Sequence, residues 1–172
     1  TAANRELTNV LASSPLSEHE YATPALGTAG SLYAAPRVSL QVLPQQSTWM
    51  LAALLSVQLP AAAPYNGDRV MLSSQAVCSD DSVPGVAEVV EFRLPPVATR
   101  LPVGAQLVLT LRNHWLAEAP MARDLEVAPM FTDFTVEIAE GIDSWIDLGL
   151  EDSFPALVCG EQYLDSAAPP QL

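Results

Sequence analysis

The fold is decided by three apolar runs: TWMLAALLSVQLP at residues 48–60, VAEVVEFRLPPVATRLP at residues 86–102 and VGAQLVLTL at residues 103–111. Apolar and polar residues alternate in much of the second and third runs, as in β-strands with one buried face. The first run is apolar without interruption from Trp49 to Leu55 and fits either a central strand or a buried helix. Because it is short and ends at Pro60, and because its neighbours resemble strands, we predict a strand buried on both faces.

Alternation continues on both sides of these runs, and turn residues separate the segments. Asn66-Gly67 and Pro84-Gly85 are typical of tight turns, and Gly104 marks another turn. The expected strands are residues 37–43, 49–59, 69–77, 86–94, 98–101, 106–113, 133–139 and 143–150. Short strands with frequent turns are typical of all-β sandwiches. We therefore predict an all-β fold, a β-sandwich of jelly-roll type with about eight strands.

The chain has 172 residues, which fits one domain with a sizeable core. We expect residues 1–35 to form an extended N-terminal arm, residues 36–150 to form the β-sandwich domain, and residues 151–172 to form an irregular C-terminal tail. The sequence starts at Thr1 without a methionine. We interpret this start as that of a processed chain or of a fragment of a longer protein.

The composition argues against two classes of partner. The chain carries 20 acidic and 7 basic residues, for a net charge of −13, and all of its basic residues are arginines. Nucleic acids require a basic surface and anionic membranes repel an acidic one, so we expect neither partner. The longest apolar run, residues 49–59, is about half as long as a membrane-spanning helix. The acidity itself favours solubility.

The sequence contains no catalytic motif. It lacks the Gly-x-Ser-x-Gly elbow of α/β-hydrolases, the glycine-rich phosphate loops and the His-Glu-x-x-His metal motif. His19 lies between two glutamates, and residues 79–82 (Ser-Asp-Asp-Ser) offer oxygen ligands of the kind that calcium takes. A solvated histidine and an ordinary turn are the better interpretations. We therefore assign no catalytic residue, no metal ligand and no cofactor to this chain.

The two cysteines, Cys78 and Cys159, are too far apart for a Cys-x-x-Cys metal or redox site. They fit one disulfide bond if the protein is exported, or two thiols if it is cytosolic. We favour the disulfide, and with it a secreted or periplasmic protein over a cytoplasmic one.

Several segments, taken in order, resemble one family of enzymes. The matching segments are residues 14–16, 36–42, 47–57 with Pro60, 90–98, 101–109 and 144–148. They resemble the C-terminal, non-catalytic jelly-roll domain of the cocaine esterase / X-prolyl dipeptidyl-peptidase group of serine hydrolases. Two positions depart from the family pattern, since Ser56 stands where Asp is usual and Ala105-Gln106 stand where many members have His-Arg.

The resemblance implies a jelly roll that docks against an α/β-hydrolase domain and helps to shape and stabilise it. The catalytic Ser, Asp and His of the family belong to that other domain, and no position of this sequence matches them. We therefore expect an accessory domain whose partner is a hydrolase domain, either in cis or as a separate chain.

Such a domain needs an apolar patch for docking. The candidate residues for a docking or ligand patch are His114, Trp115, Met121, Met130 and Phe131, together with Trp49, which also fits the core. Two alternatives stay open. One is a stand-alone carbohydrate-binding module, in which exposed aromatic rings such as Trp115 stack on sugars. The other is a structural or assembly subunit.

Overall fold

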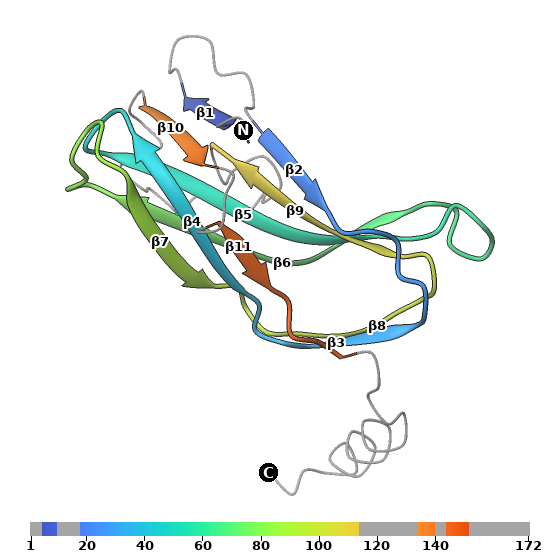
Figure 1. Cartoon of the computed structure of the whole chain (residues 1–172). Helices are drawn as coiled ribbons and strands as arrows, with labels where there is room; N and C mark the ends of the chain where they lie inside the picture. Colours follow the sequence, from blue (N-terminus) through green and yellow to red (C-terminus); the bar gives the residue numbers. More distant parts are fainter. Residues whose placement is uncertain (1–4, 10–17, 114–133, 140–143, 152–172) are drawn as a thin grey trace, which may run out of the picture.

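The computed structural model describes residues 5–9, 18–113, 134–139 and 144–151, and these form twelve β-strands (Figure 1). The strands are β1 (Arg5–Asn9), β2 (Glu18–Ala22), β3 (Gly30–Ala34), β4 (Arg37–Pro44), β5 (Trp49–Gln58), β6 (Arg69–Ser79), β7 (Glu88–Arg93), β8 (Val97–Leu101), β9 (Gln106–Arg112), β10 (Phe134–Ala139), β11 (Trp145–Asp147) and β12 (Leu150–Glu151). All of their pairings are antiparallel.

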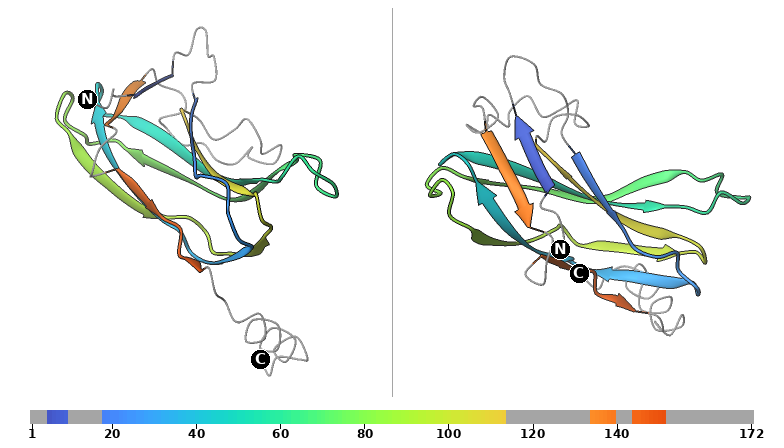
Figure 2. Two further views of the ribbon diagram at one scale, coloured as in Figure 1. Left: turned by 45° about the vertical axis from the view of Figure 1, so that its right-hand side comes forward. Right: turned by 45° about the horizontal axis from the view of Figure 1, so that its top comes forward.

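The strands lie in two layers that face each other (Figure 2). One layer is a four-stranded sheet in the order β2-β9-β5-β6. In the other layer β4 is central: β7 pairs with one side of it, and β11 and β10 pair in turn with the other side. β1 continues this sheet beyond β10, and a three-stranded sheet of β12, β3 and β8 extends the same layer (Figure 1). The predicted all-β sandwich is therefore confirmed.

The core fills the space between the layers. β5 crosses it with every residue from Trp49 to Val57 buried, so the strand predicted to be buried on both faces is confirmed. β10 instead buries alternate residues, as its sequence pattern predicts, and β4 does so except that Ser39 is buried as well. The residues that these two strands place in the core are Val38, Leu40, Val42, Phe134, Val136 and Ile138.

The predicted turns lie at residues with positive φ. Asn66 and Gly67 have φ of 57° and 76° and join β5 to β6, while Gly85 at 76° and Gly104 at 82° precede β7 and β9. Glycine adopts this left-handed region without strain, and asparagine tolerates it better than most residues. Tight reversals are thus available at these positions, and the hairpin of β5 and β6 projects beyond the other strands (Figures 1 and 2).

The extended arm expected over residues 1–35 requires a correction. Its described residues form β1, β2 and β3, which pair with β10, β9 and β8. β2 and β3 have only five residues each, and in β2 Glu18 and Glu20 lie on the exposed face. Strands this short, with a polar outer face, give little periodic signal in a sequence.

The last strand expected over residues 143–150 also requires a correction, because it is divided. β11 has three residues and pairs with β4, whereas β12 pairs with β3. Gly149 lies between them with φ of 58°. A Cβ atom added to Gly149 would come within 2.6 Å of the Ala34 side chain. A glycine is therefore needed where the chain passes from one sheet to the next.

Candidate docking surfaces

Most of the predicted patch lies outside the described residues. This holds for His114, Trp115, Met121, Met130 and Phe131, and also for Cys159. Trp49 is described and lies in the core with an exposed fraction of 1%, so it takes no part in a surface patch. Cys78 lies exposed on β6. The patch and the disulfide therefore remain predictions.

A buried polar network holds the side chain of Trp49. Its indole N–H donates to Ser82 Oγ at 2.7 Å and to Glu88 Oε1 at 3.2 Å. Ser82 Oγ lies 2.7 Å from the same carboxylate oxygen. Because a hydroxyl has a single proton and a carboxylate only accepts, Ser82 accepts from Trp49 and donates to Glu88.

The loop over residues 79–82 thus holds the core residue Trp49 in place through the hydrogen bond to Ser82. Ser79 Oγ donates to Asp81 Oδ1 at 3.0 Å, which fixes the start of the loop. No cluster of three or more His, Cys, Asp or Glu side chains suited to a metal ion occurs among the described residues. No membrane-spanning helix is found among them either.

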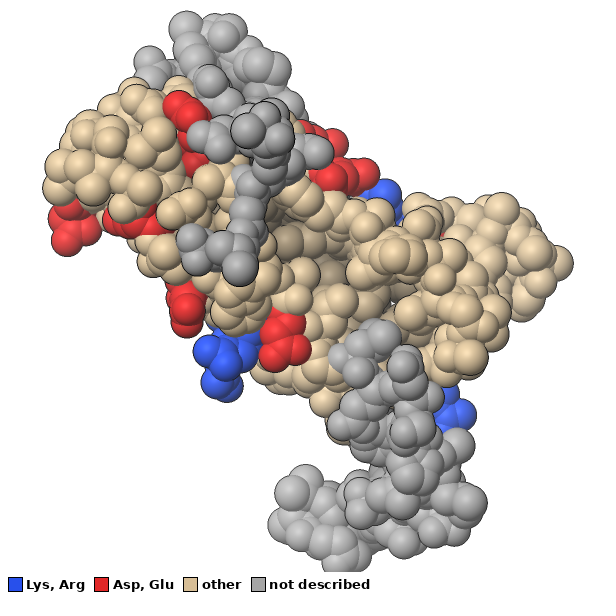
Figure 3. All heavy atoms as spheres, viewed as in Figure 1, with Lys and Arg blue, Asp and Glu red and all other residues tan. Residues whose placement is uncertain are grey.

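Two ion pairs stabilise the outer face of the four-stranded sheet. Arg112 Nε donates to Glu18 Oε2 at 2.9 Å, and Arg69 binds both carboxylate oxygens of Glu20. The hydrogen bond from Arg69 lowers the pKa of Glu20 from its usual value, and Glu20 in turn raises the pKa of Arg69. In Figure 3 the basic groups at the upper right and the lower left lie beside acidic ones.

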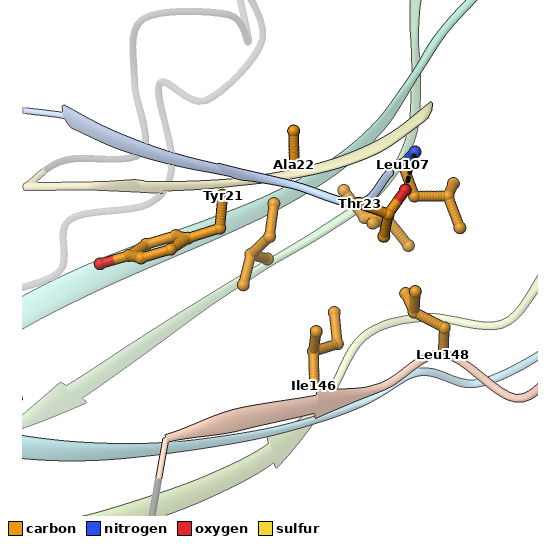
Figure 4. A pocket seen from close by; sticks show the side chains of 8 residues that line it. Tyr21, Ala22, Thr23, Leu107, Ile146 and Leu148 are labelled. Carbon is orange, nitrogen blue, oxygen red and sulfur yellow. Dashed lines mark hydrogen bonds between the residues drawn. The ribbon is translucent and has the colours of Figure 1, made fainter. Parts of the chain in front are cut away.

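An apolar groove of about 130 Å³ opens between the two layers (Figure 4). Tyr21 and Leu107 border it from the four-stranded sheet, and Ile146 and Leu148 border it from the other layer. The Thr23 hydroxyl in its wall accepts a hydrogen bond from the backbone N–H of Leu107 at 3.0 Å. The groove can take an apolar group, and its lining residues include no His, Cys, Asp, Glu or Lys that could activate the Thr23 hydroxyl as a nucleophile.

A second surface lies on the outer side of β7, β4 and β11. The strand register sets Arg37 directly opposite Arg93, and it sets Trp145 and Glu91 on either side of Ser39. Val89 lies on the same side of β7 as Glu91 and Arg93, since alternate residues of a strand share a face. We name Arg37, Val89, Glu91, Arg93 and Trp145 the Arg–Trp face.

The side chains of the Arg–Trp face contact one another only in part. The Arg37 guanidinium lies 5.9 Å from the centre of the Trp145 ring, and Arg37 Nη2 lies 3.8 Å from Glu91 Oε2. Trp145 and Val89 are 40% and 55% exposed. A hollow of about 140 Å³ is bordered by Arg37, Glu91, Arg93 and Trp145. The face therefore combines apolar surface, charge and a concave site.

Sequence reasoning finds only part of this face. The alternation over residues 37–43 places Arg37 opposite the apolar side of its strand, as the structure has it. It misses Trp145, although the alternation of Trp145 and Asp147 with Ile146, which places the tryptophan on the exposed face, is a usable signal. The pairing of β11 with β4, which brings Trp145 beside Arg37, comes from the register and has no local signature.

Comparisons with protein-family models and with curated proteins find no match for this chain. Its fold is nevertheless similar to parts of solved hydrolases. An aminopeptidase from the marine sediment archaeon Thaumarchaeota archaeon aligns with a TM-score of 0.69 and 13% identity over 88% of this chain and 33% of the aminopeptidase. An α-amino acid ester hydrolase aligns with a TM-score of 0.61 and 14% identity over 78% of this chain and 25% of the hydrolase.

A CocE/NonD family hydrolase from Staphylococcus aureus gives a third match, with a TM-score of 0.57 and 11% identity over 84% of this chain and 36% of the hydrolase. At these identities the comparisons establish the fold. This chain thus spans about a quarter to about a third of the length of the hydrolases that it matches. The fold that the family resemblance implied is confirmed.

Proposed function

We propose that this chain is an accessory, non-catalytic domain of an α/β-hydrolase that acts on ester or peptide bonds, and that it stabilises and shapes the catalytic domain. The observation that carries the proposal is the partial coverage of the matching hydrolases. The sandwich aligns with 25% to 36% of each of those chains. An accessory domain in the same polypeptide accounts for such a fraction.

The site chemistry supports the same proposal. Several of the described polar side chains are engaged in structural contacts, such as the hydrogen bonds of Trp49 and the Glu20–Arg69 ion pair. The groove is apolar, and the Arg–Trp face contains no nucleophile beside a base. These features suit a domain that binds another surface better than one that carries out a reaction.

The proposal predicts that the chain alone is inactive. Incubated with an activated ester such as p-nitrophenyl acetate, it should release p-nitrophenolate no faster than buffer does, whereas an enzyme accelerates its reaction by about a million-fold or more. The control is the polypeptide encoded by the whole reading frame. Turnover by residues 1–172 alone would contradict a non-catalytic role.

The whole reading frame tests whether a hydrolase domain accompanies this chain. We expect it to encode an α/β-hydrolase domain with a serine nucleophile elbow, and we expect removal of the present sandwich to lower the melting temperature and the activity of that domain. A reading frame without any hydrolase domain would overturn the proposal.

The carbohydrate-binding alternative gains no support from Trp145, the exposed tryptophan of the described residues. Stacking on a sugar requires an open ring face, and the Arg37 guanidinium already lies over this ring. We therefore retain the accessory-domain proposal alone.

A further inference from the structure

We propose that the Arg–Trp face is the surface through which this chain packs against the hydrolase domain of the same polypeptide, which presents a carboxylate to Arg93 and an apolar side chain to the hollow beside Trp145. This inference rests on the proposed function. It adds which face of the sandwich is covered and what chemistry covers it.

The charge pattern of the face is complementary to a carboxylate supplied by the hydrolase domain. Arg37 and Arg93 lie directly opposite each other on neighbouring strands, and like charges in this arrangement repel. Glu91 lies near Arg37, whereas Asp147, the other register partner of Arg37, accepts the Gly149 backbone N–H at 3.0 Å. Arg93 has no ion-pair partner among the described residues. A carboxylate placed over Arg93 would offset the repulsion between the two arginines.

The shape and residue types of the face fit a protein partner. Tryptophan and arginine are the residues that most often dominate binding energy at interfaces, usually beside a pocket that a partner side chain fills. The hollow of about 140 Å³ lies between these residues, and a cavity of about 150 Å³ is large enough for a benzene ring. Val89 extends the apolar part of the face and is 55% exposed.

The size of the face selects a tethered partner over a second free protein. β4, β7 and β11 have eight, six and three residues, and at about 3.3 Å per residue and about 4.8 Å between strands they present roughly 270 Å². A stable complex of free proteins buries about 800 Å² on each partner. Domain interfaces within one chain start near 600 Å² in total, about 300 Å² on each side, because the linker supplies a high effective concentration.

The other exposed apolar surfaces lack comparable features. At the tip of the β5–β6 hairpin Tyr65, Val70 and Met71 are exposed, but the neighbouring Arg69 is bound to Glu20. Nothing there specifies the chemistry of a partner. The groove beside Tyr21 is apolar and likewise carries no charge that would select one.

The test compares hydrogen–deuterium exchange over residues 88–93 in residues 1–172 alone and in the polypeptide of the whole reading frame. We expect exchange in the whole polypeptide to slow by about tenfold or more, since packing removes these edge-strand amides from water. Trp145→Ala and Arg93→Glu should each abolish that slowing and lower the melting temperature of the whole polypeptide. Arg93→Lys, which keeps the charge, should retain much of it.

Arg100→Glu is the matched control, because Arg100 is an exposed arginine on β8, outside the Arg–Trp face. It should change neither the exchange rate over residues 88–93 in the isolated chain nor the slowing of that exchange in the whole polypeptide. The Arg93 and Arg100 variants should leave the melting temperature of residues 1–172 alone nearly unchanged, whereas Trp145→Ala should lower it, because the Trp145 side chain is only 40% exposed and contacts Arg37. Equal exchange in the two forms of a protein that does contain a hydrolase domain would overturn this inference and leave the proposed function standing. A reading frame without a hydrolase domain would overturn both.

Discussion

At the scale of single residues, the Trp49 side chain depends on other groups for its position. Its ring is buried, and its one polar atom donates to Ser82 and Glu88. Burying an indole N–H without an acceptor costs free energy, so the loop that carries Ser82 is coupled to the core. Sequence alone places Trp49 in an apolar strand and Ser82 in an acidic loop, and gives no reason to pair them.

Replacing Trp49 by Phe should lower the free energy of unfolding by about 1 to 3 kcal/mol, because Ser82 and Glu88 lose their donor and the smaller ring leaves a void. Urea titration followed by circular dichroism measures this change. Ser82→Ala should cost less, about 1 kcal/mol, since Glu88 still accepts from the indole. If the double variant loses the full sum of both single losses, the two residues are not coupled as the structure indicates.

The ion pair between Glu20 and Arg69 makes part of the stability depend on pH. Arg69 lowers the pKa of Glu20. The ion pair therefore contributes fully to the free energy of unfolding above the ordinary glutamate pKa of about 4.3, and this contribution disappears as the pH falls through the lowered pKa. Both side chains are substantially exposed, at 41% and 42%, which limits the contribution to about 0.5 kcal/mol.

We therefore expect Glu20→Gln to destabilise the chain by about 0.5 kcal/mol at pH 7 and to have no effect near pH 2. Urea titrations at both pH values measure the difference. Arg69→Gln and the double variant complete a cycle that isolates the coupling between the two side chains. A loss of equal size at both pH values would show that the glutamine acts through something other than the ion pair.

At the scale of elements, Gly149 decides how the chain leaves one sheet for the next. Its φ of 58° and the 2.6 Å that would separate an added Cβ atom from the Ala34 side chain are two independent penalties for any other residue. Gly85 has only the first, with φ of 76° and no atom within 4 Å of an added Cβ, and Gly27 has no atom within 4 Å and no positive φ. The expected cost of adding a side chain thus increases from Gly27 to Gly85 to Gly149.

Alanine should be nearly neutral at Gly27, should cost about 1 kcal/mol at Gly85 and should cost about 2 to 4 kcal/mol at Gly149. Free energies of unfolding from urea titration rank the three variants. Equal losses at Gly85 and Gly149 would mean that Ala34 moves aside at no cost.

Several elements could be predicted from sequence because their signals are local. β4, β9 and β10 alternate, and the turns at Gly67, Gly85 and Gly104 use residues that tolerate positive φ. The division after β11 could not be predicted, since Ile146, Leu148 and Leu150 continue one alternation across Gly149. Strand pairing, which joins residues distant in sequence, has no local signal, and for that reason the Arg–Trp face emerges only in the structure.

At the scale of the whole molecule, the net charge of −13 keeps copies of the chain apart at neutral pH. That repulsion vanishes at the isoelectric point, near pH 4.2. Solubility, measured as the protein remaining after centrifugation across a pH series, should therefore pass through a minimum near that pH and recover below it. A solubility that is constant from pH 7 to pH 3 would contradict this expectation.

The pairing of β1 with β10 has a consequence for how the protein is made. The ribosome releases Arg5 long before its partner Ile138, and β4 likewise waits for β10 and β11. At about 5 to 20 residues per second the delay is on the order of ten seconds, far longer than a hairpin needs to form. During that interval β1 lacks β10, and the edge of β4 that later pairs with β10 and β11 stays open. Translation speed and chaperones that shield unpaired strands will therefore govern how much of this protein reaches its native state.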